Sequence, residues 1–424
     1  MTYLIKNARL IDPANKFDKI TDILIEDKKI IEIGDNLRND KAEIINAQGL
    51  VCCPGFVDLH AHFRDPGQTE KEDIISGSKA AAAGGYVHIF TMPNTVPAVD
   101  NLEILEYIKK KSEKALIKIY PIASVTKELK GENITDFETL SKNGAYAFSD
   151  DGMPIATSSL VYEALELSKK FGKPIFAHCE DLSLSSNGVV NEGEISKNLD
   201  VKGIPSVAED IGTIREILIA KYLNAKIHIC HVSTKDSAEI IRLAKNNGVK
   251  VTAEATPHHF SLDETLLLNK NADCRMSPPL RTKEDVKAIR KALKDNTIDV
   301  IATDHAPHTK LDKNNFENAK NGSIGLETAL SAGITYLVKT STLTLYELIE
   351  KMTCAPAKIA GIKAGNLSVG GLADLVLFDP NEEYKVEDST FHGKSTNSAF
   401  KNLSLFGKVK YTFCNGNIVY KSEE

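Results

Sequence analysis

The sequence predicts an α/β fold: a (β/α)8 barrel of the TIM type that carries a small discontinuous β-sandwich domain built from both ends of the chain. Two observations lead to this prediction. Between residues 51 and 361, eight short apolar runs alternate with segments of helical periodicity, and repeated strand–helix units of this kind close into a barrel. Residues 1–50 and 362–424 read as short alternating strands broken by turns, so we expect these two pieces to pair into one β domain.

Each apolar run of the middle region is a predicted barrel strand, and the segment after it repeats apolar residues at the spacing of an α-helix. The strands are expected at 51–62, 86–92, 116–124, 144–149, 174–178, 226–231, 249–256 and 298–303. The helices are expected at 73–83, 102–114, 156–171, 207–222, 234–247 and 283–295, with weaker patterns at 135–142 and 325–338.

The bulk composition is that of an ordinary globular protein. Hydrophobic residues make up 42% of the 424 residues, and 52 basic side chains against 58 acidic ones give a net charge of −6. No basic run with interleaved aromatic residues is present, which argues against nucleic-acid binding, and no apolar run is long enough to span a membrane. The seven cysteines are dispersed and form no C-x-x-C pair, so we expect reduced thiols and a cytoplasmic protein.

Polar side chains cluster where the predicted strands end. In "GFVDLHAHFRDPG", Asp58, His60 and His62 occupy alternate positions and share one face of a strand. Functional residues of this fold lie at the carboxyl ends of the strands, so groups from different strands should meet there. The convergent set comprises His60 and His62 after the first strand, Asp151 after the fourth, His178 after the fifth, His231 after the sixth and Asp304 after the eighth.

This set of side chains predicts a metal centre. Neutral imidazole and carboxylate suit borderline divalent ions, of which zinc is the most available, with manganese, cobalt and iron as alternatives. Six ligands exceed one tetrahedral site but suit two ions that share a bridging carboxylate, and Asp151 is the natural bridge. Such a pair lowers the pKa of a shared water towards neutrality, which supplies a hydroxide nucleophile.

Other histidines and carboxylates have simpler interpretations. By strand alternation His228 faces away from His231 towards the helices, and Asp58 lies deeper in the barrel than the two histidines that follow it. The side chains to which we assign core or supporting roles rather than metal ligation are His88, His228, His258, His259, Asp58 and Asp150.

Several motifs together resemble one enzyme family. "DLHAHFRDPG", "FTMPNT", "FSDDG", "HCED", "HVST", "TPHHF", "DHAPH" and "VGGLADLVLFD" are similar to those of class I dihydroorotases of the amidohydrolase superfamily, and the resemblance covers essentially the whole chain. It implies the reversible cyclisation of N-carbamoyl-L-aspartate to L-dihydroorotate with loss of water, the third step of pyrimidine (UMP) biosynthesis.

The resemblance also implies roles for the convergent set. Many relatives bridge their metals with a carboxylated lysine, whereas the class I pattern places an aspartate there. Carried over to this chain, His60 and His62 bind the first metal, His178 and His231 bind the second, Asp151 bridges them, and Asp304 lies beside the metals and shuttles protons.

Substrate contacts are implied in the same way. Arg64, Asn94 and His308 match the positions that hold the substrate's α-carboxylate, for which a planar guanidinium offers two-point binding. Ser277 stands where the family usually has asparagine, so contact with the ring edge is expected to differ. The "AKNGSIGLET" segment lacks the usual proline, and its expected contribution is backbone amides near Gly322.

Two alternative functions stay open at this point. One is a hydantoinase-like or allantoinase-like hydrolase of other cyclic amides, and the other is a non-catalytic scaffold for aspartate transcarbamoylase. The complete ligand set weighs against a scaffold, because degenerate relatives have lost metal ligands. The sequence leaves open whether the protein forms a homodimer or binds aspartate transcarbamoylase.

Overall fold

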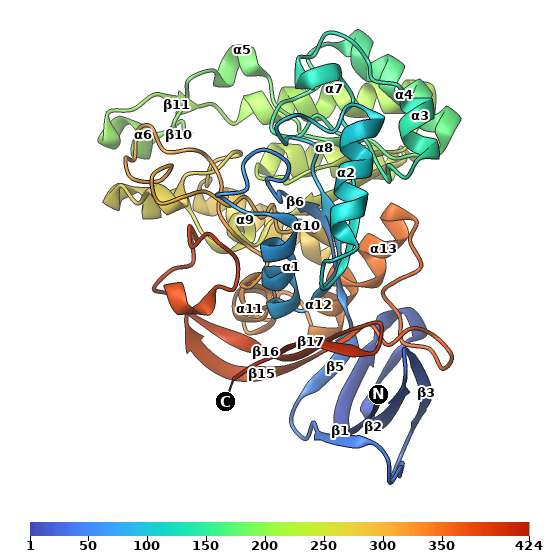
Figure 1. The fold of residues 1–424 in the computed structure, drawn as a ribbon. Coiled ribbons are helices and arrows are strands. Elements are labelled where there is room, and N and C mark those ends of the chain that lie inside the picture. Colours follow the sequence, from blue (N-terminus) through green and yellow to red (C-terminus); the bar gives the residue numbers. More distant parts are fainter. Residues whose placement is uncertain (424) are drawn as a thin grey trace.

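The computed structural model describes residues 1–423, and a barrel of parallel strands surrounded by helices forms its centre (Figure 1). One parallel sheet contains the strands β6–β8 and a second contains β9 and β12–β14. The strands are β6 (Phe56–Ala61), β7 (Tyr86–Thr91), β8 (Lys118–Pro121), β9 (Phe176–Ala177), β12 (Ile227–Ile229), β13 (Val251–Ala255) and β14 (Val300–Ile301).

Single bridges close these two sheets into a ring. Phe148 bridges Ala123 on one side and Ile175 on the other, and so occupies the fourth strand position. At the opposite junction Ala61 bridges His305. Eight parallel positions therefore surround the axis, which confirms the predicted (β/α)8 barrel.

Helices follow the strands and cover the outside of the barrel (Figure 1). Their ends obey ordinary capping rules: Asp73 and Thr282 cap α1 and α10 through capping boxes, and α4 ends at Gly172 with a left-handed φ of 68°. The helices are α1 (Ile74–Ala83), α2 (Leu102–Ser112), α3 (Phe137–Lys142), α4 (Ser158–Phe171), α7 (Val207–Leu223), α8 (Lys235–Asn246), α9 (Pro257–Ser261), α10 (Lys283–Lys294), α11 (Ala329–Gly333), α12 (Leu345–Met352) and α13 (Cys354–Ala360), with a π-helical turn at Ile334–Val338.

A long segment between β9 and α7 rises above the rim of the barrel (Figure 1). It contains short elements of its own. These are α5 (Leu182–Ser185), β10 (Val190–Asn191), α6 (Glu194–Leu199) and β11 (Gly203–Ile204).

The predicted first strand, 51–62, is in fact two strands that belong to different sheets. β5 (Val51–Pro54) pairs with the terminal strands β1 and β15, and only β6 enters the barrel. The chain divides at Gly55, whose N–H donates to the carbonyl of Asp374 at 2.9 Å. A side chain at Gly55 would collide with Val87 of the neighbouring barrel strand, so the change of sheet needs glycine.

Strands from both ends of the chain form one hydrogen-bonded sheet, the β-sandwich domain of the fold. Its order is β17-β16-β15-β5-β1-β2-β3, with β4 also paired to β1. The side chains of Tyr3 and Phe413 meet in its core, with ring centroids 5.3 Å apart. The strands are β1 (Thr2–Asp12), β2 (Phe17–Glu26), β3 (Lys29–Gly34), β4 (Glu43–Asn46), β15 (Leu375–Lys385), β16 (Ser404–Cys414) and β17 (Asn417–Lys421).

Asp374 ties this domain to the barrel. Its carboxylate pairs with Lys118 of β8, lies 3.5 Å from His88 of β7, and accepts a hydrogen bond from the N–H of Asn415 at 2.7 Å.

Among residues 1–423, no helix combines the length and the apolar character that a membrane span requires.

Candidate metal centre and active site

Six side chains from five strand ends meet at one mouth of the barrel, and all six are buried. The alternation of side chains along each strand explains why they face inward. Two of them, His231 and Asp304, have positive φ angles of 32° and 47°. The chain turns sharply at these residues as it leaves the strands. The structure thus brings together His60, His62, Asp151, His178, His231 and Asp304, all of the predicted ligand set.

The carboxylate of Asp151 lies between two pairs of histidines. Its Oδ2 atom is 3.3 Å from His60 Nε2 and 3.4 Å from His62 Nε2. Its Oδ1 atom is 3.5 Å from His178 Nδ1 and 3.3 Å from His231 Nε2. Each oxygen therefore belongs to a separate cluster of one carboxylate oxygen and two ring nitrogens, which is the arrangement a bridging carboxylate needs.

The donor atoms of both clusters fit divalent cations. His60 Nε2 is buried and has no hydrogen-bond partner within residues 1–423, which is costly unless the atom binds something else. In the other cluster the ring nitrogens His178 Nδ1 and His231 Nε2 are 2.9 Å apart. Nitrogen and carboxylate oxygen donors packed this closely are the chemistry of a borderline divalent ion.

Charge in the site favours ionised carboxylates. Burial alone would raise the pKa of Asp151, but the charge of His60 and hydrogen bonds from His178 and His231 hold it well below its usual range. Burial lowers the pKa of His178, yet Asp151 and Glu180 raise it to about 10. Metal binding must therefore displace the proton that this raised pKa places on His178.

A hydrogen-bonded layer lies behind the histidines. Glu254 of β13 accepts from His60 Nδ1 at 2.7 Å, from His228 Nε2 at 2.9 Å and from the N–H of His231 at 3.2 Å. Asp58 accepts from the N–H of His60 at 3.1 Å and from Thr303. These carboxylates fix the ring orientations.

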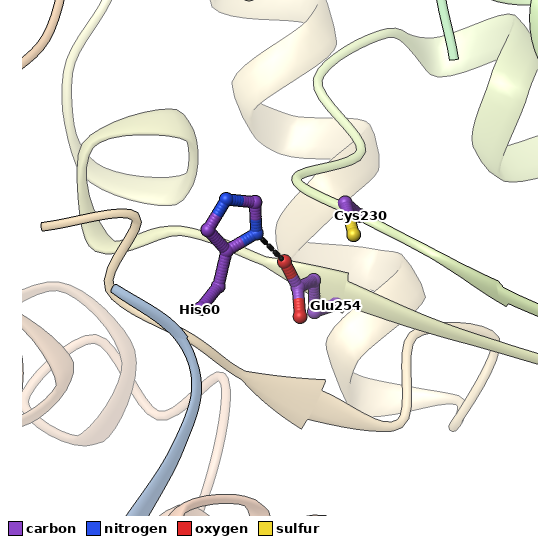
Figure 2. A group of neighbouring side chains, drawn as sticks. All are labelled: His60, Cys230 and Glu254. Atoms are coloured by element: carbon purple, nitrogen blue, oxygen red, sulfur yellow. Dashed lines mark hydrogen bonds and ion pairs between the residues drawn. The ribbon is translucent and has the colours of Figure 1, made fainter. Parts of the chain in front are cut away.

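Figure 2 shows His60, Glu254 and Cys230 as a third close group. The dashed line joins His60 Nδ1 to Glu254, so this nitrogen is already engaged. Burial raises the pKa of the Cys230 thiol well above its usual range, and a neutral thiol is a poor metal ligand. The group therefore supports the metal centre from behind rather than forming a further metal site.

A cavity of about 370 Å³ opens directly beside this cluster. Its wall includes His62, Asp151, His178 and Asp304, together with Lys320 and Asn321. Every residue that we predicted to touch substrate also lines it, namely Arg64, Asn94, Ser277, His308 and Gly322.

The polar wall of the cavity is ordered by contacts among its own residues. Asn94 Oδ1 accepts from His62 Nδ1 at 2.7 Å, which links the substrate wall to the metal cluster. Burial lowers the pKa of Arg64 to about 10, so it stays charged at neutral pH. Burial and the neighbouring Arg64 lower the pKa of His308 to about 3, so it stays neutral. Arg64 is therefore a permanent cation in the cavity wall, beside the neutral side chains of His308 and Asn94.

Comparison with known proteins agrees with this geometry. The family model described as dihydro-orotase-like matches residues 49–237, and one described as the amidohydrolase family matches residues 227–420. A protein named dihydroorotase from Lactococcus lactis subsp. lactis is 46% identical over 424 residues, covering all of both chains. One from Clostridioides difficile is also 46% identical and covers 99% of this chain and 100% of its own.

The chain belongs to the dihydroorotase family of amidohydrolases. Its fold is shared with a solved L-hydantoinase (dihydropyrimidinase) from Arthrobacter aurescens, at 25% identity and a TM-score of 0.89, over 100% of this chain and 97% of the other. Family and site together make it a metal-dependent cyclic amidohydrolase that uses a divalent ion.

Two parts of this amidohydrolase site were not foreseen from the sequence. Glu254 is a lone carboxylate within an apolar barrel strand. An isolated charge in a buried strand was the sequence feature that could have indicated its role in the site. Asn397 comes from the segment between β15 and β16, and nothing local marks it. Its Nδ2 donates to the carbonyls of Ala306 and Gly322, both at 3.1 Å, and its Oδ1 accepts from the N–H of His308 at 3.0 Å.

Gly322 allows the two loops that Asn397 joins to approach each other. Its φ is 140°, and a Cβ there would lie 2.7 Å from the Cβ of Ala306. Its N–H already donates to the carbonyl of Arg275 at 2.9 Å. The structure thus supports a spacing role for Gly322, and its contact with substrate stays a prediction.

Proposed function

We propose that the protein is a dihydroorotase that catalyses the reversible cyclisation of N-carbamoyl-L-aspartate to L-dihydroorotate and water. The observation that supports this most strongly is the composition of one cavity. It joins Asp151 and one histidine of each pair, His62 and His178, to the wall formed by Arg64, Asn94 and His308. A small substrate that carries both a ring amide and a free carboxylate needs a metal-binding surface and a carboxylate-binding surface side by side.

The substrate's α-carboxylate is assigned to the part of the cavity wall formed by Arg64, Asn94 and His308. Arg64 offers a planar cation, and its Nη2 lies 3.4 Å from His308 Nε2, so both groups can face one carboxylate. Asn94 offers an amide on the same wall. This anchoring would leave the reacting carbonyl free to face Asp151 and Asp304, which line the same cavity.

Two zinc ions are the proposed cofactors. His60 and His62 would hold one, His178 and His231 the other, and Asp151 would contribute one oxygen to each. When bound, the ions would activate water and polarise the carbonyl under attack.

Asp304 is the proposed proton carrier. Its Oδ1 lies 3.1 Å from His62 Nε2 and 3.6 Å from His60 Nε2, at the edge of the cavity. In hydrolysis, water adds to the ring carbonyl carbon, Asp304 takes the proton, and the ring nitrogen receives it as the C–N bond breaks. In cyclisation, Asp304 takes the proton from the attacking ureido nitrogen and returns it to the departing oxygen.

Substrate competition tests this function. We expect turnover of L-dihydroorotate to exceed that of hydantoin and allantoin by orders of magnitude in kcat/KM, because only dihydroorotate presents a carboxylate to Arg64. Preference for hydantoin or allantoin would contradict the proposal and favour the hydantoinase alternative. A purified protein with no bound divalent ion and no turnover of any of the three would favour the scaffold alternative.

We further propose that the enzyme works in the cytoplasm, as its dispersed free cysteines suggest. Binding to aspartate transcarbamoylase is an expectation from the family resemblance alone, and co-sedimentation of the two purified proteins would test it. Formation of a homodimer is likewise an expectation, and sedimentation of the purified protein would test it.

A further inference from the structure

A second cavity, of about 710 Å³, lies at the opposite end of the barrel from the metal centre. Lys226 and Lys250 line it, and they directly precede β12 and β13, so the cavity is at the amino ends of the strands. Residues of α12 and α13 form its other side. We call this cavity the floor pocket. Its volume is within the range of about 300–1,000 Å³ that is usual for small-molecule sites.

Lys351 of α12 places a buried cation in the wall of the floor pocket. It is 3% exposed, and its Nζ donates to Asn296 Oδ1 at 2.9 Å and to the carbonyl of Ile298 at 3.1 Å. An ammonium has three N–H donors, so one remains, and Lys351 forms no ion pair among residues 1–423. Burial lowers the pKa of Lys351 to about 8, so it stays charged at neutral pH. Because a buried charge without a counter-ion is costly, an anion in the pocket would supply what Lys351 lacks.

Three further lysines line the floor pocket at its exposed edge. They are Lys226, Lys250 and Lys358, and none of them forms an ion pair within the described part of the chain. The carboxylates of the same wall are those of Asp299 and Glu350. With the buried lysine, four ammonium groups therefore face two carboxylates, and the pocket favours an anion over a cation or a neutral ligand.

The remaining polar groups of the floor pocket are largely engaged within the protein. Asp299 pairs with Lys245 at 2.6 Å. At the inner end of the pocket, Thr252 Oγ1 lies 2.9 Å from His228 Nδ1, and His228 Nε2 donates to Glu254 at 2.9 Å. His228 thus faces the barrel interior, and the prediction that it faces the helices is wrong. The hydrogen-bonding capacity left for a ligand is mainly that of the lysine donors, which call for a ligand rich in acceptors.

The rest of the wall is apolar, which sets a second requirement on the ligand. Its apolar side chains include Pro174, Ile227, Val251, Ala355 and Ile359. A small inorganic anion would leave these side chains in contact with water, whereas a ligand with an organic body would cover them. The two kinds of wall therefore match a phosphate ester, whose phosphate oxygens accept hydrogen bonds and whose body is large enough to bury the apolar part.

We propose that the floor pocket binds a nucleoside monophosphate. Its phosphate lies among Lys351 and the three edge lysines, which bind it as point charges, and its nucleoside lies against the apolar wall. The floor pocket and the active-site cavity share no lining residue, so this proposal does not depend on the proposed function.

Protection of Cys354 from alkylation tests the proposal. Cys354 lines the floor pocket and is partly exposed, whereas the other six cysteines are buried. We expect AMP at ten times its dissociation constant to slow the reaction of Cys354 with iodoacetamide about tenfold. Adenosine at the same concentration should give no protection, and inorganic phosphate should protect only at much higher concentration. Absence of protection by AMP would overturn the proposal, and so would equal protection by adenosine or by inorganic phosphate.

Lysine variants test whether the buried cation holds the phosphate. We expect Lys351→Met to weaken protection by AMP about 10–100-fold, because a charged hydrogen bond is lost. Lys313→Met is the matched control, since Lys313 is also buried, has a pKa lowered to about 8 and donates to two carbonyls, but lines a different cavity. The double variant Lys250→Gln with Lys358→Gln, at exposed positions, should weaken AMP binding without affecting folding. Equal effects of Lys351→Met and Lys313→Met, or unchanged AMP binding in the double variant, would overturn the proposal.

Discussion

Glu254 holds His60 in one tautomer. The carboxylate oxygen lies 2.7 Å from His60 Nδ1 and both side chains are fully buried, so Nδ1 carries the proton and donates it to Glu254. In the neutral ring, the other nitrogen, Nε2, carries the lone pair that a metal would bind, and it faces Asp151 at 3.3 Å. The orientation of a metal ligand thus depends on a residue that does not itself face the cavity.

Replacing Glu254 should therefore weaken metal binding without removing a ligand. We expect Glu254→Gln to lower the affinity for zinc about 10–100-fold, since the amide can present an N–H to His60 and disfavour the required tautomer. Competition with a chromophoric chelator measures this affinity. Cys230→Ser is the matched control from the same group (Figure 2) and should leave the affinity unchanged. A larger loss in Cys230→Ser than in Glu254→Gln would show that the thiol is a ligand.

Replacing the proposed proton carrier should lower the catalytic rate while the metal content stays the same. We expect Asp304→Asn to lower kcat by about 10²–10⁴-fold, because general acid–base help is lost, while zinc stays bound by the four histidines and Asp151. Asp150→Asn is the control, since Asp150 turns away to accept from Thr126 N–H and Oγ1 at 2.9 and 2.6 Å. Rate measurements and metal analysis on the same preparations check both points. Near-normal kcat in Asp304→Asn would exclude the assigned role.

The carboxylate anchor should be sensitive to the shape of the cation and not only to its charge. We expect Arg64→Lys to raise KM for dihydroorotate about 10–100-fold, because an ammonium cannot bind a carboxylate at two points. Steady-state kinetics with dihydroorotate and with a ring amide lacking the carboxylate provide the comparison. An equal loss for both substrates would mean that Arg64 supports the fold of the loop rather than the anchor.

Asn397 is expected to position the substrate loops. Asn397→Leu removes three hydrogen bonds that hold Ala306, His308 and Gly322 together, so KM should rise more than kcat falls. Asn397→Asp keeps the acceptor for the N–H of His308 and should recover part of the loss. The thermal midpoint of both variants serves as a control for folding. A fall in kcat alone, with KM unchanged, would contradict this positioning role.

Asp374 should make the attachment of the β domain sensitive to acid. Burial would raise its pKa, but His88 and Lys118 lower it to about 2 from an ordinary 3.8. Because the folded pKa is depressed, its stabilisation is present above pH 4 and is lost as the pH falls towards 2. At pH 7 the shift is worth about 2 kcal/mol.

Thermal unfolding of Asp374→Asn checks this expectation. The variant should be less stable than the wild type at pH 7, and the difference should shrink as the pH falls from 4 to 2. Asp388→Asn, which removes an exposed carboxylate paired with Lys401 at 3.3 Å, should have little effect at either pH. A difference between Asp374→Asn and the wild type that persists at pH 2 would show that charge is not the cause.

The fold could be predicted largely because each barrel unit is local. Apolar runs and helical periodicity are properties of short segments, so most predicted helices agree with the structure to within a few residues. The exceptions depend on partners distant in sequence. β5 joins β1 and β15 because the N–H of Gly55 reaches Asp374, and the fourth barrel position has only Phe148 as a bridging residue.

The candidate site also contains residues that could be predicted from the sequence and residues that could not. The convergence of His60, Asp151 and Asp304 follows from strand order alone, since every parallel strand of a barrel ends at the same mouth. Asn397 could not be found from the sequence, because its position beside His308 depends on how the C-terminal segment packs against the barrel. The orientation of Glu254 likewise depends on the side chain of His60, which lies on a barrel strand far away in the sequence.

Anomalous diffraction at the zinc edge from crystals of the zinc-loaded protein is the most direct test of the central claim. We predict two peaks, one beside the His60–His62 pair and one beside the His178–His231 pair, each in contact with a different oxygen of Asp151. A single peak with Asp151 bound through one oxygen, or no peak within reach of Asp151, would contradict a carboxylate-bridged pair of cations.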